Sequence, residues 1–346
     1  MYKLKNKIDN VMPEYYINNF GDILYGIKNK NELFFNQEMI YKGKINSFRL
    51  FNKSIFISKS DEKIFINENI KRKINIDFGF FIVDDFSVLF NLYSNDYSKQ
   101  YYKYYNFKED KEYWTIEKYF GNFIHQDNYL FTSCFDKNYL SKKICKISLT
   151  TPQTPQWQFD LSQLGTFYSE LSQQQEAYKV EKFIGIHQDR LYVALNGGML
   201  LEIDIATGEL THRWEGDFST RNFSLDTSKN ELVSLHNREY HHINIDTKEH
   251  NIINIKSELE KYDIVFIRHQ GDISSSHIYA IAHLKNDIWF KDGIVAFNRK
   301  TQKIDWFYED ETFTTGTDTP KIAGNKLYQL SLNNELYIFE KTSNEI

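Results

Sequence analysis

Histidines are the residues of this chain whose number invites a metal-binding hypothesis. The densest group is His236, His241, His242 and His250. His241 and His242 are adjacent in an expected strand, so their side chains point to opposite faces and at most one of them can join His236. A further ligand would have to come from a distant part of the chain. We therefore expect ordinary strand-surface histidines and no metal site.

Carboxylate pairs could provide the acid and the base for glycoside cleavage. The candidates are Asp84-Asp85 and Glu309-Asp310-Glu311, but both groups fall at expected turns, where acidic side chains are commonly just solvated. The two cysteines, Cys134 and Cys145, are too few and too badly spaced for a disulfide framework or a zinc site. No Gly-x-Ser-x-Gly, phosphate-binding glycine loop or His-Glu-x-x-His motif occurs. The sequence predicts no catalytic residue and no cofactor.

The elements that would position any site follow an internal repeat. A large aliphatic residue followed by an aromatic residue or valine recurs after polar turns at Leu24-Tyr25, Ile55-Phe56, Leu89-Phe90, Leu130-Phe131, Leu191-Tyr192, Leu232-Val233, Ile278-Tyr279 and Leu327-Tyr328. The successive spacings are 31, 34, 41, 61, 41, 46 and 49 residues, mostly the length of a four-stranded propeller blade. We expect an all-β fold, a β-propeller of eight four-stranded blades. Seven blades are the alternative, if residues 10 to 44 merge with their neighbour.

Residues 181 to 216 form the clearest repeat unit, with four short strand-like runs. Gly197-Gly198 joins the second run to the third, and Thr207-Gly208 joins the third to the fourth, as tight hairpin turns require. The last unit, at 326 to 341, lacks a fourth strand. The alternating segment Tyr2 to Ile8 can supply it, and we expect this N-terminal strand to join the last blade and close the ring.

Four tryptophans recur at one position of the repeat. Trp114, Trp157, Trp214 and Trp306 all fall in the expected fourth strand of their blades. An aromatic ligand surface is one interpretation. Because the position repeats with the architecture, we favour the other, in which these side chains pack blade against blade.

Two segments resemble a known repeat family. Residues 201–210, which include Asp204, Thr207 and Gly208, and residues 295–306 look like pyrroloquinoline-quinone-like (PQQ-like) and YVTN-type propeller repeats, roughly apolar-x-Asp-x-x-Thr-Gly with a following Trp. The match is partial at Ile245-Asp246-Thr247 and at 339–342, and faint before residue 120. The resemblance implies the fold and not an activity. Because the cysteine pair and metal site of quinone-dependent dehydrogenases are missing, it implies no quinone cofactor here.

Two insertions interrupt the repeat. In the longest interval, apolar residues at 161, 164, 168 and 171 follow helical spacing and predict a helical insertion at 161–178. A second insertion, at 284–292, lengthens the loop between the second and third strands of its blade and places Trp289 and Phe290 in a polar setting. Both kinds of connection emerge on one face of a propeller. We expect that face to bind a partner through Trp289 and Phe290, with a loop that buries its own aromatic residues as the alternative.

Charge and hydropathy limit the class of partner. The chain has 42 basic and 47 acidic residues, a formal net charge of -5 and no basic block, so nucleic acid is not an expected partner. No stretch reaches the length of apolar residues that a membrane-spanning helix needs, and no apolar core follows the N-terminal lysines. We expect a cytoplasmic protein with no membrane partner.

These observations favour a single β-propeller domain over residues 1–346 that binds another protein and is not an enzyme. A concrete form is an inhibitor, for instance an immunity protein that neutralises a toxin partner. The alternative is a hydrolase or lyase that acts on a carbohydrate or small molecule in the central channel, where residues from several blades would converge. A structural scaffold within a larger complex is a third hypothesis.

Overall fold

The computed structural model describes residues 1–18, 20–59, 62–67, 70–74, 80–94, 99–117, 120–135, 141–285, 291–311 and 313–342. Nearly all regular structure in these ranges is β-strand. Helical turns occur at Leu161–Leu164, at α1 (Lys256–Leu259) and at Glu260–Tyr262. Within the described ranges, no helix has the length and apolar character needed to cross a membrane.

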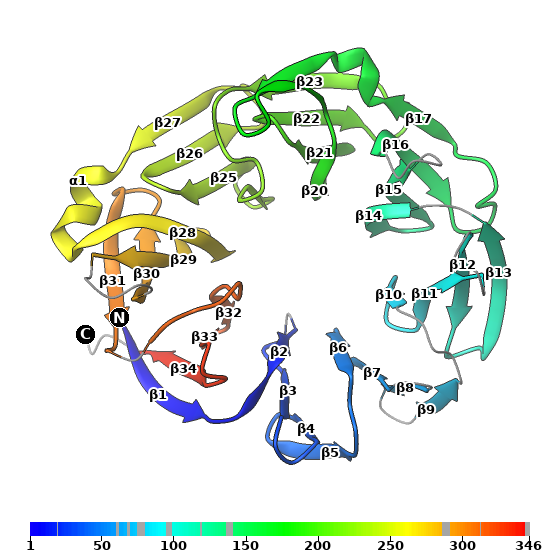
Figure 1. Ribbon diagram of the computed structural model, residues 1–346, viewed down its shortest axis with the longest axis horizontal. Coiled ribbons are helices and arrows are strands. Elements are labelled where there is room, and N and C mark those ends of the chain that lie inside the picture. Colours follow the sequence, from blue (N-terminus) through cyan, green and yellow to red (C-terminus); the bar gives the residue numbers. More distant parts are fainter. Residues whose placement is uncertain are drawn as a thin grey trace. The chain divides into compact units, whose positions relative to one another are not determined.

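Eight four-stranded antiparallel sheets follow one another along the chain (Figure 1). The chain divides into two compact units, and we describe each by itself. The first comprises Met1–Asp77, Val233–Ile243 and Asn251–Ile346, and the second comprises Phe78–Leu232 and Asn244–His250. The sheet β24–β27 contributes residues to both units: β24 (Ser224–Asp226), β25 (Glu231–His236), β26 (Glu239–Asn244) and β27 (His250–Asn254).

Four complete sheets belong to the first unit. Their strands are β2 (Val11–Ile17), β3 (Ile23–Ile27), β4 (Glu32–Phe35) and β5 (Glu38–Lys42); β6 (Ser47–Phe51), β7 (Ser54–Ser58), β8 (Lys63–Asn67) and β9 (Ile70–Ile74); β28 (Ile264–Ile273), β29 (His277–Leu284), β30 (Asp292–Asn298) and β31 (Lys303–Glu309); and β32 (Lys321–Ala323), β33 (Lys326–Leu330), β34 (Leu336–Lys341) and β1 (Tyr2–Ile8). Residues 11–42 thus form a sheet of their own, which confirms eight blades over seven.

Three complete sheets belong to the second unit. Their strands are β10 (Phe80–Ile82), β11 (Ser87–Tyr93), β12 (Gln100–Asn106) and β13 (Lys111–Glu117); β14 (Phe120–Gln126), β15 (Tyr129–Phe135), β16 (Ser141–Ser148) and β17 (Trp157–Asp160); and β20 (Val180–His187), β21 (Arg190–Leu195), β22 (Met199–Asp204) and β23 (Leu210–Glu215). The last of these sheets reproduces the four runs expected at 181 to 216, including the turn at Gly197-Gly198, where both residues have positive φ.

The N-terminal strand completes the last blade, as the sequence predicts. Figure 1 shows β1 beside β34, and the two strands pair antiparallel from Tyr2 with Lys341 to Ile8 with Leu336. The indole N–H of Trp306 donates to the carbonyl of Tyr2 at 2.9 Å, which ties β1 to the preceding blade as well. The first and last segments of the chain are therefore joined by a sheet without a covalent bond.

The hydrophobic core lies between consecutive sheets. In the first unit, Leu24 and Leu33 of one sheet pack with Phe48 and Ile57 of the next. The second unit repeats the arrangement in a cluster that joins β15–β17 to β20–β22. Neighbouring sheets thus cover apolar residues of strands such as β7 and β21, whereas the outer strands β5 and β9 have no buried residue.

The prediction of a helical insertion at 161–178 is wrong for most of its length. A single 3-10 turn at Leu161–Leu164 ends at Gly165, whose φ of 82° and ψ of -143° belong to a region that essentially only glycine adopts. The chain then forms a two-stranded hairpin, β18 (Thr166–Ser169) and β19 (Gln174–Ala177). The helical spacing of the apolar residues is a coincidence, because two belong to the turn and two belong to the hairpin.

Candidate binding surface

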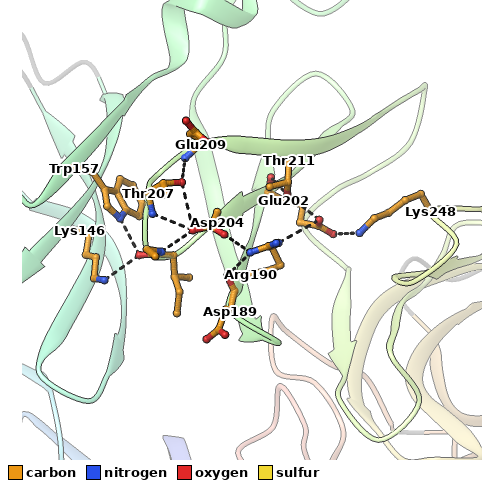
Figure 2. Close-up of polar contacts among 12 residues, drawn as sticks. Lys146, Trp157, Asp189, Arg190, Glu202, Asp204, Thr207, Glu209, Thr211 and Lys248 are labelled. Atoms are coloured by element: carbon orange, nitrogen blue, oxygen red, sulfur yellow. Dashed lines mark hydrogen bonds and ion pairs between the residues drawn. The ribbon is translucent and has the colours of Figure 1, made fainter.

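The motif with the clearest family resemblance is structural. The Oδ1 atom of Asp204 accepts the backbone N–H groups of Ala206 and Thr207 at 2.9 and 3.0 Å and so fixes the turn between β22 and β23 (Figure 2). Trp157 of the preceding blade donates its indole N–H to the carbonyl of Ile205 at 3.0 Å. A Cβ atom at Gly208 would lie 2.6 Å from the Trp157 ring. The glycine of the motif therefore makes room for the tryptophan.

The same interblade bond recurs at the other three tryptophans of the repeat. Trp114 donates to the carbonyl of Leu149, and Trp214 donates to that of Lys248, at 2.7 and 3.0 Å. With Trp157 and Trp306, all four indole N–H groups reach a backbone carbonyl of the following blade. These residues act in packing, as the repeated position predicts, and they leave no aromatic ligand surface.

A charge network around one buried carboxylate joins the blades after the Asp204 turn. Glu202 on β22 is only 3% exposed, and Figure 2 shows its carboxylate between Lys248 and Arg190. It forms an ion pair with Lys248 of the next blade and accepts the hydroxyl of Thr211 at 2.8 Å. Arg190 also pairs with Asp204. The charges are mutually compensated, so this network holds blades together and offers no free reactive group.

The histidine group does not converge on a metal site. His241 and His242 are neighbours on β26, as expected, and His241 is 3% exposed. Across the described ranges, no three His, Cys, Asp or Glu side chains are placed to hold a metal ion. Burial lowers the pKa of His236, and the nearby charges of His269 and His241 lower it further. Burial also lowers the pKa of His241, so both of these side chains favour the neutral form.

The other sequence candidates also have structural roles. Asp84 accepts the backbone N–H of Phe86 at 2.8 Å within a turn, and Glu309 forms an ion pair with Lys291 at 3.1 Å. Cys134 and Cys145 lie on the neighbouring strands β15 and β16 and form no disulfide.

The predicted anchors Trp289 and Phe290 lie outside the described residues. What the structure does describe is the base of their loop, where Leu284 donates to the carbonyl of Lys291 at 3.0 Å. Asp292 at the start of β30 is fully buried, and its Oδ2 atom accepts both the N–H and the hydroxyl of Thr315. The insertion therefore begins and ends on a fixed framework.

The β18–β19 hairpin of the second unit presents the most exposed apolar side chain of the described chain. Leu171, in the turn between the two strands, is 98% exposed, and Tyr168 on β18 is 56% exposed. Neither residue was singled out as an anchor from the sequence, where both belong to the expected helix. The signal that could have found Leu171 is its position as a lone aliphatic residue within Glu170-Leu171-Ser172-Gln173-Gln174-Gln175.

The base of the hairpin is held firmly while its tip is free of the core. Phe167 packs against the turn of the next blade, where a Cβ atom at Gly197 would lie 2.5 Å from its ring. Its ring also contacts Tyr178 at a centroid distance of 5.2 Å. The backbone N–H of Lys179 donates to the Asn196 side chain at 2.7 Å. A rigid base therefore orients an exposed tip.

The tip of the hairpin is acidic as well as apolar. Hydrogen bonds from the hydroxyls of Ser172 and Ser169 lower the pKa of Glu176, so its charge is maintained at neutral pH. Glu170 adds a second carboxylate beside Leu171. A surface that complements the tip would combine an apolar pocket with a basic rim.

Comparisons with solved structures find the same fold in proteins of very different sequence. BamB from Moraxella catarrhalis superposes with a TM-score of 0.56 at 12% identity, over 100% of this chain and 99% of that one. The computationally designed Ika8 protein gives 0.56 at 9% identity over 92% and 93% of the two chains. Sqt1 of Saccharomyces cerevisiae gives 0.56 at 10% identity over 97% and 100%.

Comparisons with protein-family models and with curated protein sequences give no match. At identities of 12% or less, the likeness to solved structures concerns the fold alone. At the level of the fold, this likeness confirms the resemblance to PQQ-like and YVTN-type propeller repeats. The chain has the fold of an eight-bladed β-propeller.

Proposed function

We propose that this protein is a non-enzymatic propeller that binds another protein through the tip of the β18–β19 hairpin. The observation that carries the proposal is the 98% exposure of Leu171 on a hairpin whose base is fixed by Phe167. Transfer of a leucine side chain from water into an apolar pocket contributes about 1.5–3 kcal/mol, which is the size of an interface hot spot. Tyr168 adds an aromatic surface with a hydroxyl that can donate to the partner.

The finer form of the proposal is an inhibitor, such as a cytoplasmic immunity protein that neutralises a toxin. A basic rim on the toxin would meet Glu170 and Glu176. The two cysteines without a disulfide agree with a reducing compartment. From the sequence we also propose Trp289 and Phe290 as a second contact, which a Trp289→Ala, Phe290→Ala double variant would weaken.

The test is an affinity capture from a lysate of the source cell with three baits. The baits are the wild-type protein, a Tyr168→Ser, Leu171→Ser double variant, and an Ile252→Ser control, in which the replaced side chain is 54% exposed on β27. We expect one protein in stoichiometric amount on the wild type and the control, and its loss from the double variant. Equal capture by the double variant would refute the hairpin as the binding element.

The inhibitor form is tested with the captured protein itself. Expressed alone, it should arrest growth, and co-expression of the wild-type propeller should restore growth while the double variant should not. A captured protein that is harmless when expressed alone would contradict the inhibitor proposal and leave the binding proposal standing.

A further inference from the structure

A polar pocket of about 470 Å³ lies in the first unit, far along the chain from the hairpin. The end of β2, the end of β28 and the segment 319–324 line it. Asp272 donates its backbone N–H to the carbonyl of Pro320 at 2.9 Å, and a Cβ atom at Gly271 would lie 2.2 Å from that same oxygen. The close approach that forms the pocket therefore depends on glycine at position 271.

Asp272 is the acceptor in this pocket. Its Oδ2 atom accepts the backbone N–H of Ile322 at 2.8 Å. Its Oδ1 atom has no hydrogen-bond or ion-pair partner among the described residues. Partial desolvation by the surrounding protein raises the pKa of this carboxyl above its ordinary value, and repulsion from Asp318 adds to the effect, although the side chain remains exposed at the mouth of the pocket. Asp272 is exposed, so this oxygen is open to a hydrogen-bond donor of a ligand.

Lys321 is the donor. Its ammonium group contacts the carbonyl of Tyr15 and the Oδ1 atom of Asp318, both at 3.3 Å, and lies 3.8 Å from the centre of the Tyr15 ring. Two of these contacts are to oxygen atoms and the third is to the face of an aromatic ring. Asp318 is itself held through Oδ2 by Gln329 and by the backbone of Leu330. The ammonium is thus fixed in place, and the Lys321 side chain is still 30% exposed and accessible to a ligand.

The two charged side chains that line the pocket, Asp272 and Lys321, have opposite signs. A cationic ligand would be attracted by Asp272 but repelled by Lys321. An anionic ligand would be attracted by Lys321 but repelled by Asp272. A hydroxyl group both donates and accepts, so two neighbouring hydroxyls can satisfy Asp272 and Lys321 together. Thr319 adds a third hydrogen-bonding side chain to the lining. The volume lies within the range of small-molecule sites.

We propose that this pocket binds a small neutral polyhydroxylated compound, of the monosaccharide or polyol class. The site is for binding and not for glycoside cleavage, because cleavage needs two available carboxylates and Asp318 is fully engaged in holding Lys321. This proposal is independent of the protein-binding hairpin.

The test is titration of the full chain with D-glucose, D-galactose and myo-inositol, followed by saturation-transfer NMR and calorimetry. A ligand of this size held by a few hydrogen bonds has a Kd of about 1 mM. We expect at least one of the three to bind in that range. Putrescine and inorganic phosphate serve as cationic and anionic probes, and binding of either one in place of the polyols would overturn the proposal, as would no binding of any polyol at about 10 mM.

Variants test whether the polyol binds in this pocket. Asp272→Asn retains an oxygen for the Ile322 N–H but replaces the free acceptor with a donor, so affinity should fall about ten-fold or more. Thr319→Val should also weaken binding of the polyol. It is the test variant if circular dichroism shows that Asp272→Asn does not fold. Leu171→Ser on the hairpin should bind the polyol as the wild type does. Unchanged affinity in folded pocket variants would overturn the assignment.

Discussion

At the scale of single residues, the turn after β22 gives the family-like sequence motif a structural role that involves no chemistry. Asp204 fixes the turn, and the residue four positions later takes a positive φ. Asn244 and Asn298 hold equivalent turns, with Lys248 and Gln302 at the positive-φ positions. Glycine occupies this position in only one of the three turns, at Gly208, which packs against a tryptophan.

The three turns predict that substitutions at the positive-φ position change the free energy of unfolding in opposite directions. Gly208→Ala should destabilise the protein by about 2 kcal/mol or more, because the added methyl group meets the Trp157 ring and the left-handed conformation costs about 1 kcal/mol. Gln302→Gly should stabilise it by about 0.5 kcal/mol, since it relieves the same strain. Urea unfolding measures both. A loss of stability in Gln302→Gly would contradict the account of the turn.

Several histidines make stability depend on pH. Burial is the main cause of a lowered pKa at His212, His236, His241 and His269. The unfolded chain therefore binds more protons than the folded one as pH falls below the ordinary histidine value, and stability falls with it. The urea midpoint should decrease between about pH 7.5 and 5.5. His236→Gln should reduce this decrease, and a midpoint that is flat or rises on acidification would refute the prediction.

At the scale of elements, β1 is the strand whose removal should matter most. Its loss would expose the edge of β34 and take away the carbonyl that Trp306 binds and the hydroxyl of Tyr2, which lies 3.1 Å from that of Tyr279. Deletion of residues 1–9 should lower the melting temperature by at least about 5 °C. A synthetic peptide of residues 1–9 should restore part of the loss by strand addition, and a scrambled peptide should not. An unchanged melting temperature would show that β1 is dispensable.

The strands of the blades could be predicted from the sequence because each is short, alternating and bounded by turn residues. The unit from β20 to β23 follows the expected runs within a few residues. The hairpin could not be predicted, because its conformation depends on Phe167 packing over Gly197, a contact between positions separated by a blade boundary. The polar pocket was also missed, since Asp272 and Lys321 meet only in the folded chain.

At the scale of the whole molecule, the same kind of packing contact recurs between consecutive blades. Within the described residues the core clusters join consecutive sheets, and the four tryptophans of the repeat each bond to the following blade. Stability in such an array is shared by neighbour-to-neighbour contacts. The blades before residue 120 carry little of the family motif, yet Val88, Phe90 and Tyr102 on β11 and β12 are buried there as well.

We propose that residues 1–346 unfold as one domain. The sheet β24–β27 contributes to both compact units, so neither unit can unfold without breaking that sheet. Scanning calorimetry should show a single transition with equal calorimetric and van't Hoff enthalpies. Two resolved transitions would mean that the units are separate domains.

The central claim is that the hairpin tip is where this propeller meets its protein partner. A photo-cross-linking amino acid placed at position 171 in the source cell tests it directly, with Leu332, which is 57% exposed in the first unit, as the control position. The account predicts one dominant adduct from position 171 and none of the same mass from position 332. No adduct at 171, or the same adduct from both positions, would contradict it.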